Sequence, residues 1–444
     1  MRVLLVYTNR NRFMAPPPIG LATLCPPLLS RGHEVRLLDL MFVARPRAAL
    51  DAALDTFRPD VVGFSIRNLD EQDMAHPTSP LDAIRPLVRT VTARGILTVL
   101  GGAAFTTFPE RILELMGADY GIAGQAESSL PRLLDSIDGG IDPTIPGLVW
   151  RDGDQIRANP PDQPGYAGVR ADWSQIDHRR YRRSMFQAAV MLRSGCAHRC
   201  SYCDVPAVFG DHFIPRDQES ILEDLRCLRD EHGVRMVFLV DGSFNSPVAD
   251  AKESLEQLVR RRLRLYLSST FVPVTGEYDD EFFSLYRKAG GLFAVFGIDA
   301  LSDTMLQSYR KPFTLDDVVR SCELATRHGV RVICTVMFGG PGETDATIDE
   351  AVRTIARLPY SILAPGFGIR ILPRTHLFEI SRSAGLVRDA DELLMPRFYL
   401  SPDFDAARAR ARVNDAIRRH GWRMLRMIPA GARMLLARTF GLTL

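Results

Sequence analysis

The chain alternates short β-rich runs with helical patterns in two separate series, and this alternation limits its fold more than any other feature. In the first series, over about 140 residues, we expect a first helix at 19–30 and strands at 3–7, 35–38, 61–66 and 97–100. Strands that alternate with helices form a parallel sheet covered by helices. The N-terminal part is therefore predicted to be an α/β domain with an open parallel sheet of the Rossmann or flavodoxin type. Ligands of such sheets lie beyond the carboxyl ends of the strands.

The second series predicts six strands, at 188–192, 236–240, 265–269, 293–297, 330–337 and 366–372. Helices fill the intervals, for example at 279–289 and 315–328. Six such units over about 190 residues fit a partial (β/α)6 barrel of the TIM type better than an eightfold barrel, which needs about 250 residues. In such barrels the chemistry lies at the carboxyl ends of the strands.

Between the two series the pattern breaks. Proline, an Asp-Gly pair and an Arg-rich run over 143–183 predict a small hairpin, with strands at 148–150 and 155–157, followed by a linker. The chain is therefore expected to have four parts: an open-sheet domain (1–140), a hairpin and linker (141–185), a partial barrel (186–390) and a basic helical C-terminal segment (391–444).

Charge is balanced overall but not along the chain. The 55 basic and 53 acidic residues give a formal net charge of +2, which does not predict a nucleic-acid partner. From Arg408 to the end, however, the segment contains nine arginines and one acidic residue, Asp415, so its net charge is +8.

The basic segment has helical spacing between Asp415 and Ile428, and a second short helix is expected at 432–440. A basic amphipathic helix either packs its apolar side on the barrel or makes peripheral contact with an anionic membrane or an acidic partner. Both alternatives stay open. The apolar side would hold Ile417, Met424 and Ile428, and another side Arg419, Arg423 and Arg426.

The cysteine content predicts a reducing, cytoplasmic location. Seven cysteines in 444 residues are too sparse for a disulfide scaffold, and three of them lie close together, which favours metal chemistry. The N-terminal apolar run is too short for a signal peptide, and no apolar stretch approaches the ~20 residues that span a bilayer.

The clustered cysteines, Cys196, Cys200 and Cys203, follow the first strand of the second series with C-x3-C-x2-C spacing. Three thiolates can hold a [4Fe–4S] cluster and leave one iron open for a substrate or cofactor. The alternative is a Cys3His zinc site that recruits His198. The other cysteines are interpreted as small buried residues: Cys25, Cys227, Cys322 and Cys334.

This cysteine motif, with an aromatic residue before its last cysteine, resembles that of the radical S-adenosylmethionine (SAM) enzymes. Further segments resemble the family's motifs in the same order. They are Val237–Asn245 on the second strand, Phe296–Ala300 on the fourth strand, with Asp for Glu and Ala for Ser, Lys311 after it, Met337–Thr344 on the fifth strand and Arg370–Thr375 on the sixth.

The first half resembles the cobalamin (B12)-binding domain that precedes the barrel in many such enzymes. The hairpin at 146–157 is also typical of that subgroup. The Asp-x-His-x-x-Gly sequence whose histidine ligates cobalt in cobalamin mutases is absent, as it commonly is in this subgroup. The segments that carry the resemblance are Pro17–Ala22, Asp60–Ile66, Gly101-Gly102 and Gly124–Glu127.

The resemblance implies three cofactors: a [4Fe–4S] cluster on Cys196, Cys200 and Cys203, SAM chelated by the open iron, and cobalamin. It implies a 5′-deoxyadenosyl radical that abstracts hydrogen from a small-molecule substrate, and a methyl group supplied by methylcobalamin. The reaction expected from it is methylation of an unactivated carbon, less often phosphorus, of a natural-product or lipid precursor. An external one-electron reductant of the flavodoxin or ferredoxin type would be the partner.

The resemblance also implies site residues. Asp241 and Ser243 are candidates for the SAM amino group, Asp299 for its ribose or carboxylate, and Tyr202 for adenine. Arg67 and Asn68, at the tip of the third strand, are candidates for contact beneath cobalt, or are simply solvated. The full SAM set is Tyr202, Asp241, Gly242, Ser243, Asp299, Phe338, Gly339 and Arg370, and the cobalamin set is Pro18, Gly20, Arg67, Asn68, Gly101, Gly102, Gly124 and Glu127.

Two other functions stay open. A radical SAM enzyme that keeps the cobalamin domain can catalyse a cyclisation, ring rearrangement or other radical step without methyl transfer. A non-catalytic module with structural zinc is the alternative from a different class.

Overall fold

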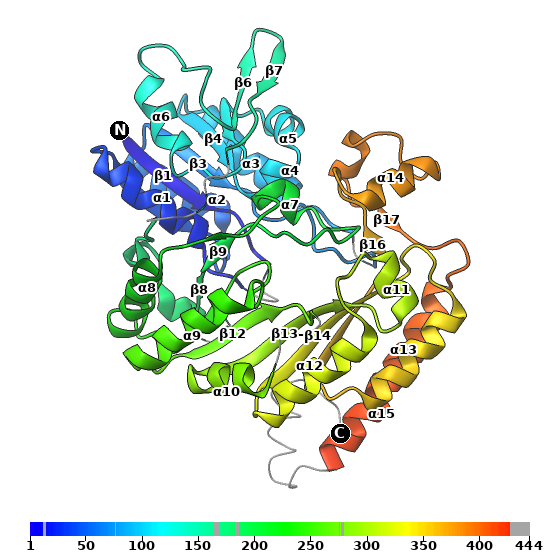
Figure 1. Cartoon of the computed structure of the whole chain (residues 1–444). Helices are drawn as coiled ribbons and strands as arrows, with labels where there is room; N and C mark the ends of the chain where they lie inside the picture. Colours follow the sequence, from blue (N-terminus) through cyan, green and yellow to red (C-terminus); the bar gives the residue numbers. More distant parts are fainter. Residues whose placement is uncertain are drawn as a thin grey trace.

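The computed structural model describes residues 1–11, 15–75, 77–162, 165, 169–182, 184, 186–274, 276 and 279–426. Two α/β units are stacked on each other, with the N-terminal sheet above the barrel in the view of Figure 1. Within the described residues, no helix is both long and apolar enough to cross a membrane.

The N-terminal unit is a seven-stranded sheet in the order β2-β1-β3-β4-β5-β6-β7. Strands β1 to β5 are parallel, and the predicted hairpin, β6 and β7, extends this sheet antiparallel at its edge instead of standing apart. The strands are β1 (Arg2–Tyr7), β2 (Glu34–Asp39), β3 (Val61–Ser65), β4 (Leu97–Gly101), β5 (Tyr120–Ile122), β6 (Leu148–Asp152) and β7 (Gln155–Ala158). The helices are α1 (Ile19–Ser30), α2 (Pro46–Phe57), α3 (Leu81–Thr92), α4 (Ala103–Thr107), α5 (Pro109–Met116) and α6 (Ser129–Ser136).

The predicted open parallel sheet is confirmed, because each predicted strand and the first helix are present. In β1, five consecutive residues from Val3 to Tyr7 are buried, as expected for a central parallel strand covered by helices on both faces. The sequence analysis did not predict β5, which has only three residues.

The second unit is a six-stranded parallel sheet in the order β15-β14-β13-β12-β11-β8. Strands β8 and β15 are the two edges and do not pair with each other, so the barrel is open, as predicted. The strands are β8 (Ala188–Val190), β11 (Met236–Leu239), β12 (Tyr266–Phe271), β13 (Gly291–Asp299), β14 (Arg331–Phe338) and β15 (Ile362–Phe367). The helices between them are α8 (Gln218–Asp230), α9 (Val248–Arg261), α10 (Asp280–Lys288), α11 (Asp303–Ser308), α12 (Leu315–Arg327) and α13 (Asp345–Arg357).

The sixth strand lies earlier than the predicted 366–372. It ends at Phe367, and the chain turns at Gly368, whose φ of +84° interrupts the extended backbone. The next two residues form β16 (Ile369–Arg370), which pairs antiparallel with β17 (Phe398–Tyr399). The prediction of one continuous strand was wrong because it ran two short strands together.

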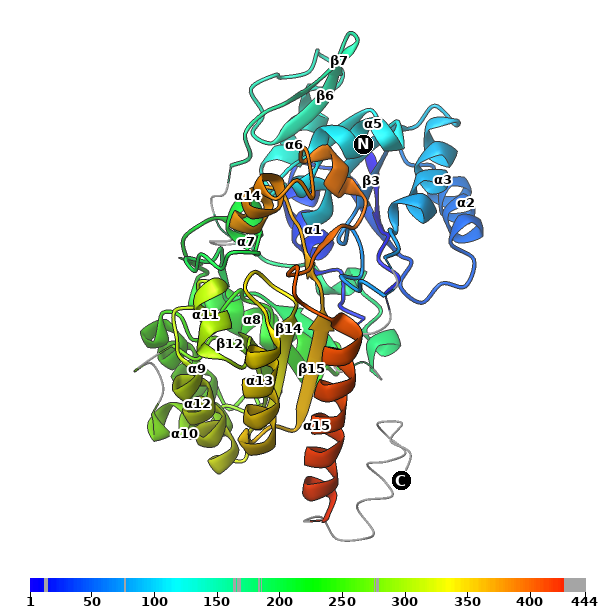
Figure 2. The same cartoon turned by 90° about the vertical axis from the view of Figure 1, so that its right-hand side faces the viewer.

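The basic segment forms α15 (Ala406–Arg426), which starts nine residues before the predicted helix. It runs beside α13 and the edge strand β15 (Figure 2). Val413 is fully buried, and the Arg412 guanidinium pairs with the carboxylates of Asp345 and Asp349 on α13. The described part of this helix therefore packs on the barrel. The second helix expected at 432–440 lies outside the described residues.

The linker between the units contains η1 (Trp173–Gln175) and η2 (His178–Tyr181). The remaining short elements belong to the second unit: β9 (Arg193–Ser194), α7 (Val205–Phe209), β10 (Ile214–Pro215), α14 (His376–Ser383) and η3 (Asp391–Leu394).

A side chain from the loop after β3 and a backbone carbonyl of α4, which follows β4, join the two units. The Arg370 Nε donates to Asp70 Oδ2 at 2.7 Å, and both side chains are almost completely buried. The Arg374 guanidinium donates to the carbonyl of Thr106 at 3.1 Å. Asp70 and Thr106 follow β3 and β4, and Arg370 and Arg374 follow β15, so the carboxyl edges of the two sheets face each other.

We expect Asp70→Ala to lower the free energy of unfolding by about 3–5 kcal/mol, because it leaves the Arg370 charge buried and unpaired. Anaerobic urea unfolding, followed by circular dichroism, measures the change. Asp135→Ala is the control, since Asp135 pairs with Arg31 at the surface, where water screens the interaction. Equal urea midpoints for Asp70→Ala and the unmutated protein would contradict the role given to this pair.

Candidate active site

The three clustered cysteines lie on a loop that backbone hydrogen bonds hold from several sides. The Cys196 N–H donates to the carbonyl of Gly210 at 3.0 Å, and the Ser201 N–H donates to the carbonyl of Tyr309 at 3.0 Å. The carbonyl of Ser201 in turn accepts from the N–H of Leu377 at 2.7 Å. The loop is therefore fixed by contacts with the ends of α7 and α11 and with α14 rather than by a strand of its own.

The arrangement of the three thiols suits a cluster better than a single ion. Cys196, Cys200 and Cys203 do not all come within 4.8 Å of one another, whereas one other group of the described residues does. Thiolates on one tetrahedral zinc lie about 3.8 Å apart, because each Zn–S bond is about 2.3 Å. In an iron–sulfur cluster each thiolate binds a different iron, so the sulfurs lie further apart.

Burial keeps the thiols of Cys196 and Cys203 protonated when no metal is bound. It raises the pKa of Cys203 to about 12 and also raises the pKa of Cys196. Metal binding at this loop therefore has to displace thiol protons, and it becomes more favourable as pH rises. His198, which the zinc alternative needs as a fourth ligand, packs its ring edge-on against Phe213, 5.8 Å between centroids.

Beside the cysteine loop, the Asp299 carboxylate accepts from three side chains, one of which is the Thr335 hydroxyl, which donates to Oδ1 at 3.4 Å. The Lys311 ammonium and the Tyr202 hydroxyl both donate to Asp299 Oδ2. Asp299 has a φ of +59°, at the point where the pairing of β13 with β14 shifts. These bonds place Tyr202 and Asp299 next to each other, as a shared SAM site requires. Their contacts with SAM stay predictions.

Lys311 is a buried cation. Burial opposes its charge, but the carboxylate of Asp299 and the thiol of Cys200 outweigh this effect and raise the pKa of Lys311. Burial, and then the Asp299 carboxylate, raise the pKa of Tyr202 well above its usual value, so its hydroxyl stays a donor. The three side chains therefore form one charge-balanced group beside Cys200.

The segment after β11 packs under the cysteine loop. Asp241 Oδ1 accepts hydrogen bonds from the backbone N–H groups of Leu192, at 2.8 Å, and Arg193, at 3.2 Å. Because these N–H groups bind Asp241, β8 ends at Val190, two residues before the predicted boundary. A side chain at Gly242 would lie 3.3 Å from the Cβ of Cys196, so glycine permits this close approach. The Ser243 hydroxyl donates to Asn245 Oδ1 at 3.1 Å.

Asp241 is buried with one oxygen still available. Burial raises the pKa of Asp241 to about 6, against the lowering effect of Arg193. Asp241 Oδ2 has no hydrogen-bond partner among the described residues, and the Arg193 Nε lies 3.8 Å from it. This free oxygen fits the predicted contact with the SAM amino group, which stays a prediction.

The other residues of the predicted SAM set have contacts within the chain. Besides Asp70, the Arg370 guanidinium donates to the carbonyls of Ile371 and Leu393, at 2.6 and 2.7 Å. Phe338 stacks on Phe367, 5.3 Å between ring centroids, and the Gly339 N–H donates to Glu343 at 3.2 Å. Arg370 thus holds the two units together, and a contact with SAM remains a prediction for it.

The loops predicted to bind cobalamin lie along the carboxyl edge of the N-terminal sheet. Gly102 has a φ of +101°, and a side chain there would lie 2.6 Å from the carbonyl oxygen of Ile66, so only glycine fits. The buried carboxyl of Glu127 accepts from the Thr23 hydroxyl at 2.8 Å, and burial raises its pKa. The remaining members of the set lie on the same edge or its loops: Pro18, Gly20, Gly101 and Gly124.

Arg67 and Asn68 lie directly after β3, on this edge and three and two residues before Asp70. The exposed Arg67 guanidinium donates to Asn68 Oδ1 at 2.8 Å. These two residues are therefore carried by the segment that the Asp70–Arg370 pair fixes against the barrel. Their contact with cobalamin stays a prediction.

Comparison with known families agrees with both units. The family model described as radical SAM superfamily matches residues 191–355, and the model described as B12 binding domain matches residues 10–134. The chain is a radical SAM enzyme with a B12-binding domain.

Several characterised proteins resemble this radical SAM enzyme. Tryptophan 2-C-methyltransferase of Streptomyces laurentii is 25 % identical over 439 residues, which cover 82 % of this chain and 72 % of that protein. Hopanoid C-3 methylase of Methylococcus capsulatus is 28 % identical, covering 74 % and 62 %. Anaerobic magnesium-protoporphyrin IX monomethyl ester cyclase of Rubrivivax gelatinosus is 24 % identical, covering 80 % and 65 %.

Among solved structures, the radical SAM methyltransferase TsrM of Kitasatospora setae, with cobalamin and a [4Fe–4S] cluster bound, has a similar fold. The TM-score is 0.82 at 24 % identity, and the match covers 94 % of this chain and 91 % of that one. This likeness supports the arrangement of an open sheet above a partial barrel.

The residues present fit the cofactors that these families imply, a [4Fe–4S] cluster, SAM and cobalamin. Three cysteines and no fourth lie on the loop, and their sulfurs do not all lie within 4.8 Å of one another. The unpartnered oxygen of Asp241 lies in the segment packed against Cys196.

Sequence reasoning missed several residues of this radical SAM site. Lys311 received no role, although it anchors Asp299, and Arg193 and Asp70 were not singled out. Lys311 had been noted among the motifs that resemble the family, and it is one of only three lysines among the 55 basic residues. For Asp70 there was no signal, because its partner lies 300 residues away in sequence.

We expect Cys203→Ala to lower the iron content of the anaerobically reconstituted enzyme from about four per chain to below about one, with loss of the brown colour. Iron analysis by mass spectrometry measures this. Cys322→Ala is the matched control, because Cys322 is buried beside Cys334, 3.9 Å between sulfurs, and outside the loop. Four irons in Cys203→Ala, or zinc in place of iron in the unmutated protein, would contradict the cluster.

Proposed function

We propose that this radical SAM enzyme is a cobalamin-dependent methyltransferase that methylates an unactivated carbon, less often phosphorus, of a small natural-product or lipid precursor. The observation that carries the proposal is the placement of the two carboxyl edges. The Asp70–Arg370 and Arg374–Thr106 contacts hold the predicted cobalamin edge directly against the barrel edge that bears the cysteines. A methyl carrier and a SAM site can then serve one enclosed substrate.

When bound, the [4Fe–4S] cluster and SAM supply radical and methyl chemistry, and cobalamin supplies a methyl carrier. The chain's own part is to bind and to position. Cys196, Cys200 and Cys203 would hold the cluster. The buried Asp241 carboxylate accepts backbone N–H groups after β8 and so fixes the chain where it enters the cysteine loop. Lys311 donates to the Asp299 carboxylate and fixes its orientation beside the cysteine loop.

The relatives support methyl transfer to carbon. Two of them are described as methylating carbons of tryptophan and of a hopanoid, which are an amino acid and a lipid. A second candidate, a radical cyclisation or ring rearrangement without methyl transfer, is favoured by the relative described as a cyclase. A non-catalytic zinc module is the least supported, since the three cysteine sulfurs are too dispersed for one ion.

The proposed reaction needs an external one-electron reductant, for which a flavodoxin or ferredoxin is proposed, and the reducing cytosol is the proposed location. Peripheral membrane contact through the basic segment also stays a proposal. Its described arginines include Arg408 and Arg412, which already pair with Asp345 of α13.

We expect the anaerobically reconstituted enzyme to convert SAM into both S-adenosylhomocysteine and 5′-deoxyadenosine, because a methylation through a substrate radical uses one SAM for each purpose. Chromatography with mass detection, on enzyme supplied with cobalamin, reductant and candidate substrates, measures the two products. Cys203→Ala is the control for cluster-dependent turnover. 5′-Deoxyadenosine without S-adenosylhomocysteine would exclude methyl transfer and favour the cyclase alternative.

We expect Arg67→Ala to weaken cobalamin binding about tenfold or more, because an arginine offers charged donors to the amide carbonyls around the corrin ring. Equilibrium binding, followed by cobalamin absorbance, measures the dissociation constant. Arg89→Ala, on the exposed side of α3, is the matched control and should bind normally. Equal affinities of Arg67→Ala and the unmutated enzyme would remove Arg67 from the cobalamin site.

A further inference from the structure

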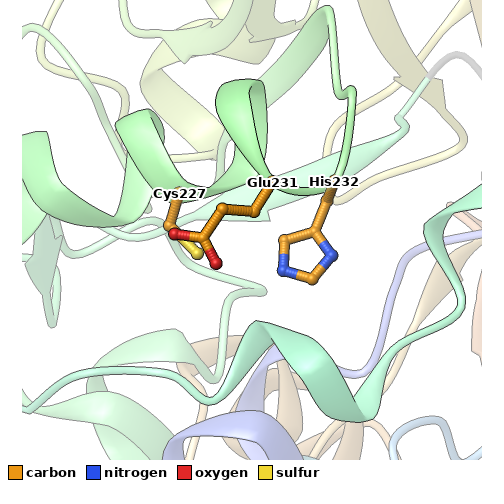
Figure 3. Close-up of side chains that lie close together, drawn as sticks. All are labelled: Cys227, Glu231 and His232. Carbon is orange, nitrogen blue, oxygen red and sulfur yellow. The ribbon is translucent and has the colours of Figure 1, made fainter.

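A second group of potential metal ligands lies at the end of α8, away from the cysteine loop. Cys227, Glu231 and His232 each offer one ligand atom, and these three atoms lie within 4.8 Å of one another. In Figure 3 the three side chains extend from the end of the helix toward the same space. Cys227 and Glu231 are one helical turn apart, so the helix itself brings the sulfur and the carboxylate together.

A fourth candidate ligand lies on the linker between the two units, next to His232, although its ring nitrogens are not within 4.8 Å of all three atoms of the group. His178, on η2, is only 5 % exposed, and its ring centroid lies 4.9 Å from that of His232. Its Nδ1 is 3.4 Å from the carbonyl oxygen of Gln187, and its Nε2 has no hydrogen-bond partner among the described residues.

The contact with Gln187 decides which nitrogen of His178 is free. A carbonyl oxygen only accepts hydrogen bonds, so this contact favours the tautomer with the proton on Nδ1 and the lone pair on Nε2. Histidines that bind metals show this pattern, in which one ring nitrogen donates to a backbone carbonyl and the other faces the ion. A buried nitrogen without a partner otherwise destabilises the fold, because it has lost its hydrogen bonds to water.

We propose that Cys227, Glu231, His232 and His178 bind one zinc ion. One thiolate, two imidazole nitrogens and one carboxylate make a four-ligand set of the kind that tetrahedral zinc prefers. The zinc displaces the thiol proton of Cys227, which passes to solvent, and no oxidation or reduction occurs. The geometry differs from that of the cysteine loop, where the sulfurs do not converge on one point.

The site joins the linker to the first helix of the barrel. The same linker also contacts α8 close to His178, because the Trp173 indole donates to Asp224 Oδ1 at 2.8 Å. The other oxygen of Asp224 accepts from the Arg216 guanidinium at 2.5 Å. A zinc ion would add a bond between η2 and the end of α8. Its role would therefore be structural, and it does not depend on the reaction that the enzyme catalyses.

The experiment measures zinc and iron in the same reconstituted enzyme by mass spectrometry. We expect about one zinc per chain in addition to the cluster iron, and a fall to about one tenth of that zinc in His232→Ala and in His178→Ala, with iron unchanged. His328→Ala is the matched control, because His328 is also half-buried but bonds to Asp280 at 2.9 Å. It should keep its zinc.

X-ray absorption at the zinc edge of the unmutated enzyme gives an independent readout, should His178→Ala fail to fold. We expect one sulfur at about 2.3 Å and three lighter atoms at about 2.0–2.1 Å. Zinc below one tenth per chain after growth and dialysis with added zinc would overturn the proposal. So would zinc that persists in His232→Ala, or a zinc shell of three sulfurs, which would place the ion on the cysteine loop.

Discussion

The buried ion pair between Asp70 and Arg370 is the contact on which the relation of the two units depends. An arginine with almost no exposed surface needs partners for its charge, and here each guanidinium nitrogen donates, to a carboxylate or to one of two main-chain carbonyls. Because each partner follows the end of a parallel strand, the pair sets the two carboxyl edges face to face. The ligand sites of both folds lie at those edges, so the pair also decides that they share one space.

Near the cysteine loop, too, each buried charge has a charged or hydrogen-bonding partner, here from segments that lie close to the loop. Lys311 and Asp299 are both buried, and each compensates for the other's loss of water. Asp241 is held by backbone N–H groups and faces Arg193. Neighbouring ion pairs and backbone hydrogen bonds thus stabilise the cysteine loop, which has no regular secondary structure of its own. Asp241 Oδ2 is among the buried polar atoms that stay without a partner and can bind an incoming ligand.

Periodicity and local motifs were sufficient to predict the parts of the fold that depend on neighbouring residues. The first helix has the predicted bounds, Ile19–Ser30, and the six barrel strands occur in the predicted order. The errors concern features that depend on distant contacts or on one backbone angle. The turn at Gly368 divides the predicted sixth strand, and α15 begins early because it packs along α13, which no local pattern indicates.

The site shows the same division. The cysteine loop was found because its three ligands are within eight residues, whereas the role of Lys311 emerges only when β13 and the segment after α11 come together. Cys227 is the clearest case. Its sequence neighbourhood is that of an amphipathic helix, and it was interpreted as a packing residue. His178 lies 49 residues before it, in a linker without any motif, and only the fold brings its unpartnered nitrogen to the end of α8. Spacing along the chain therefore reveals metal ligands that share one loop, and a site assembled from two segments has to be recognised by the polar atoms it leaves unsatisfied.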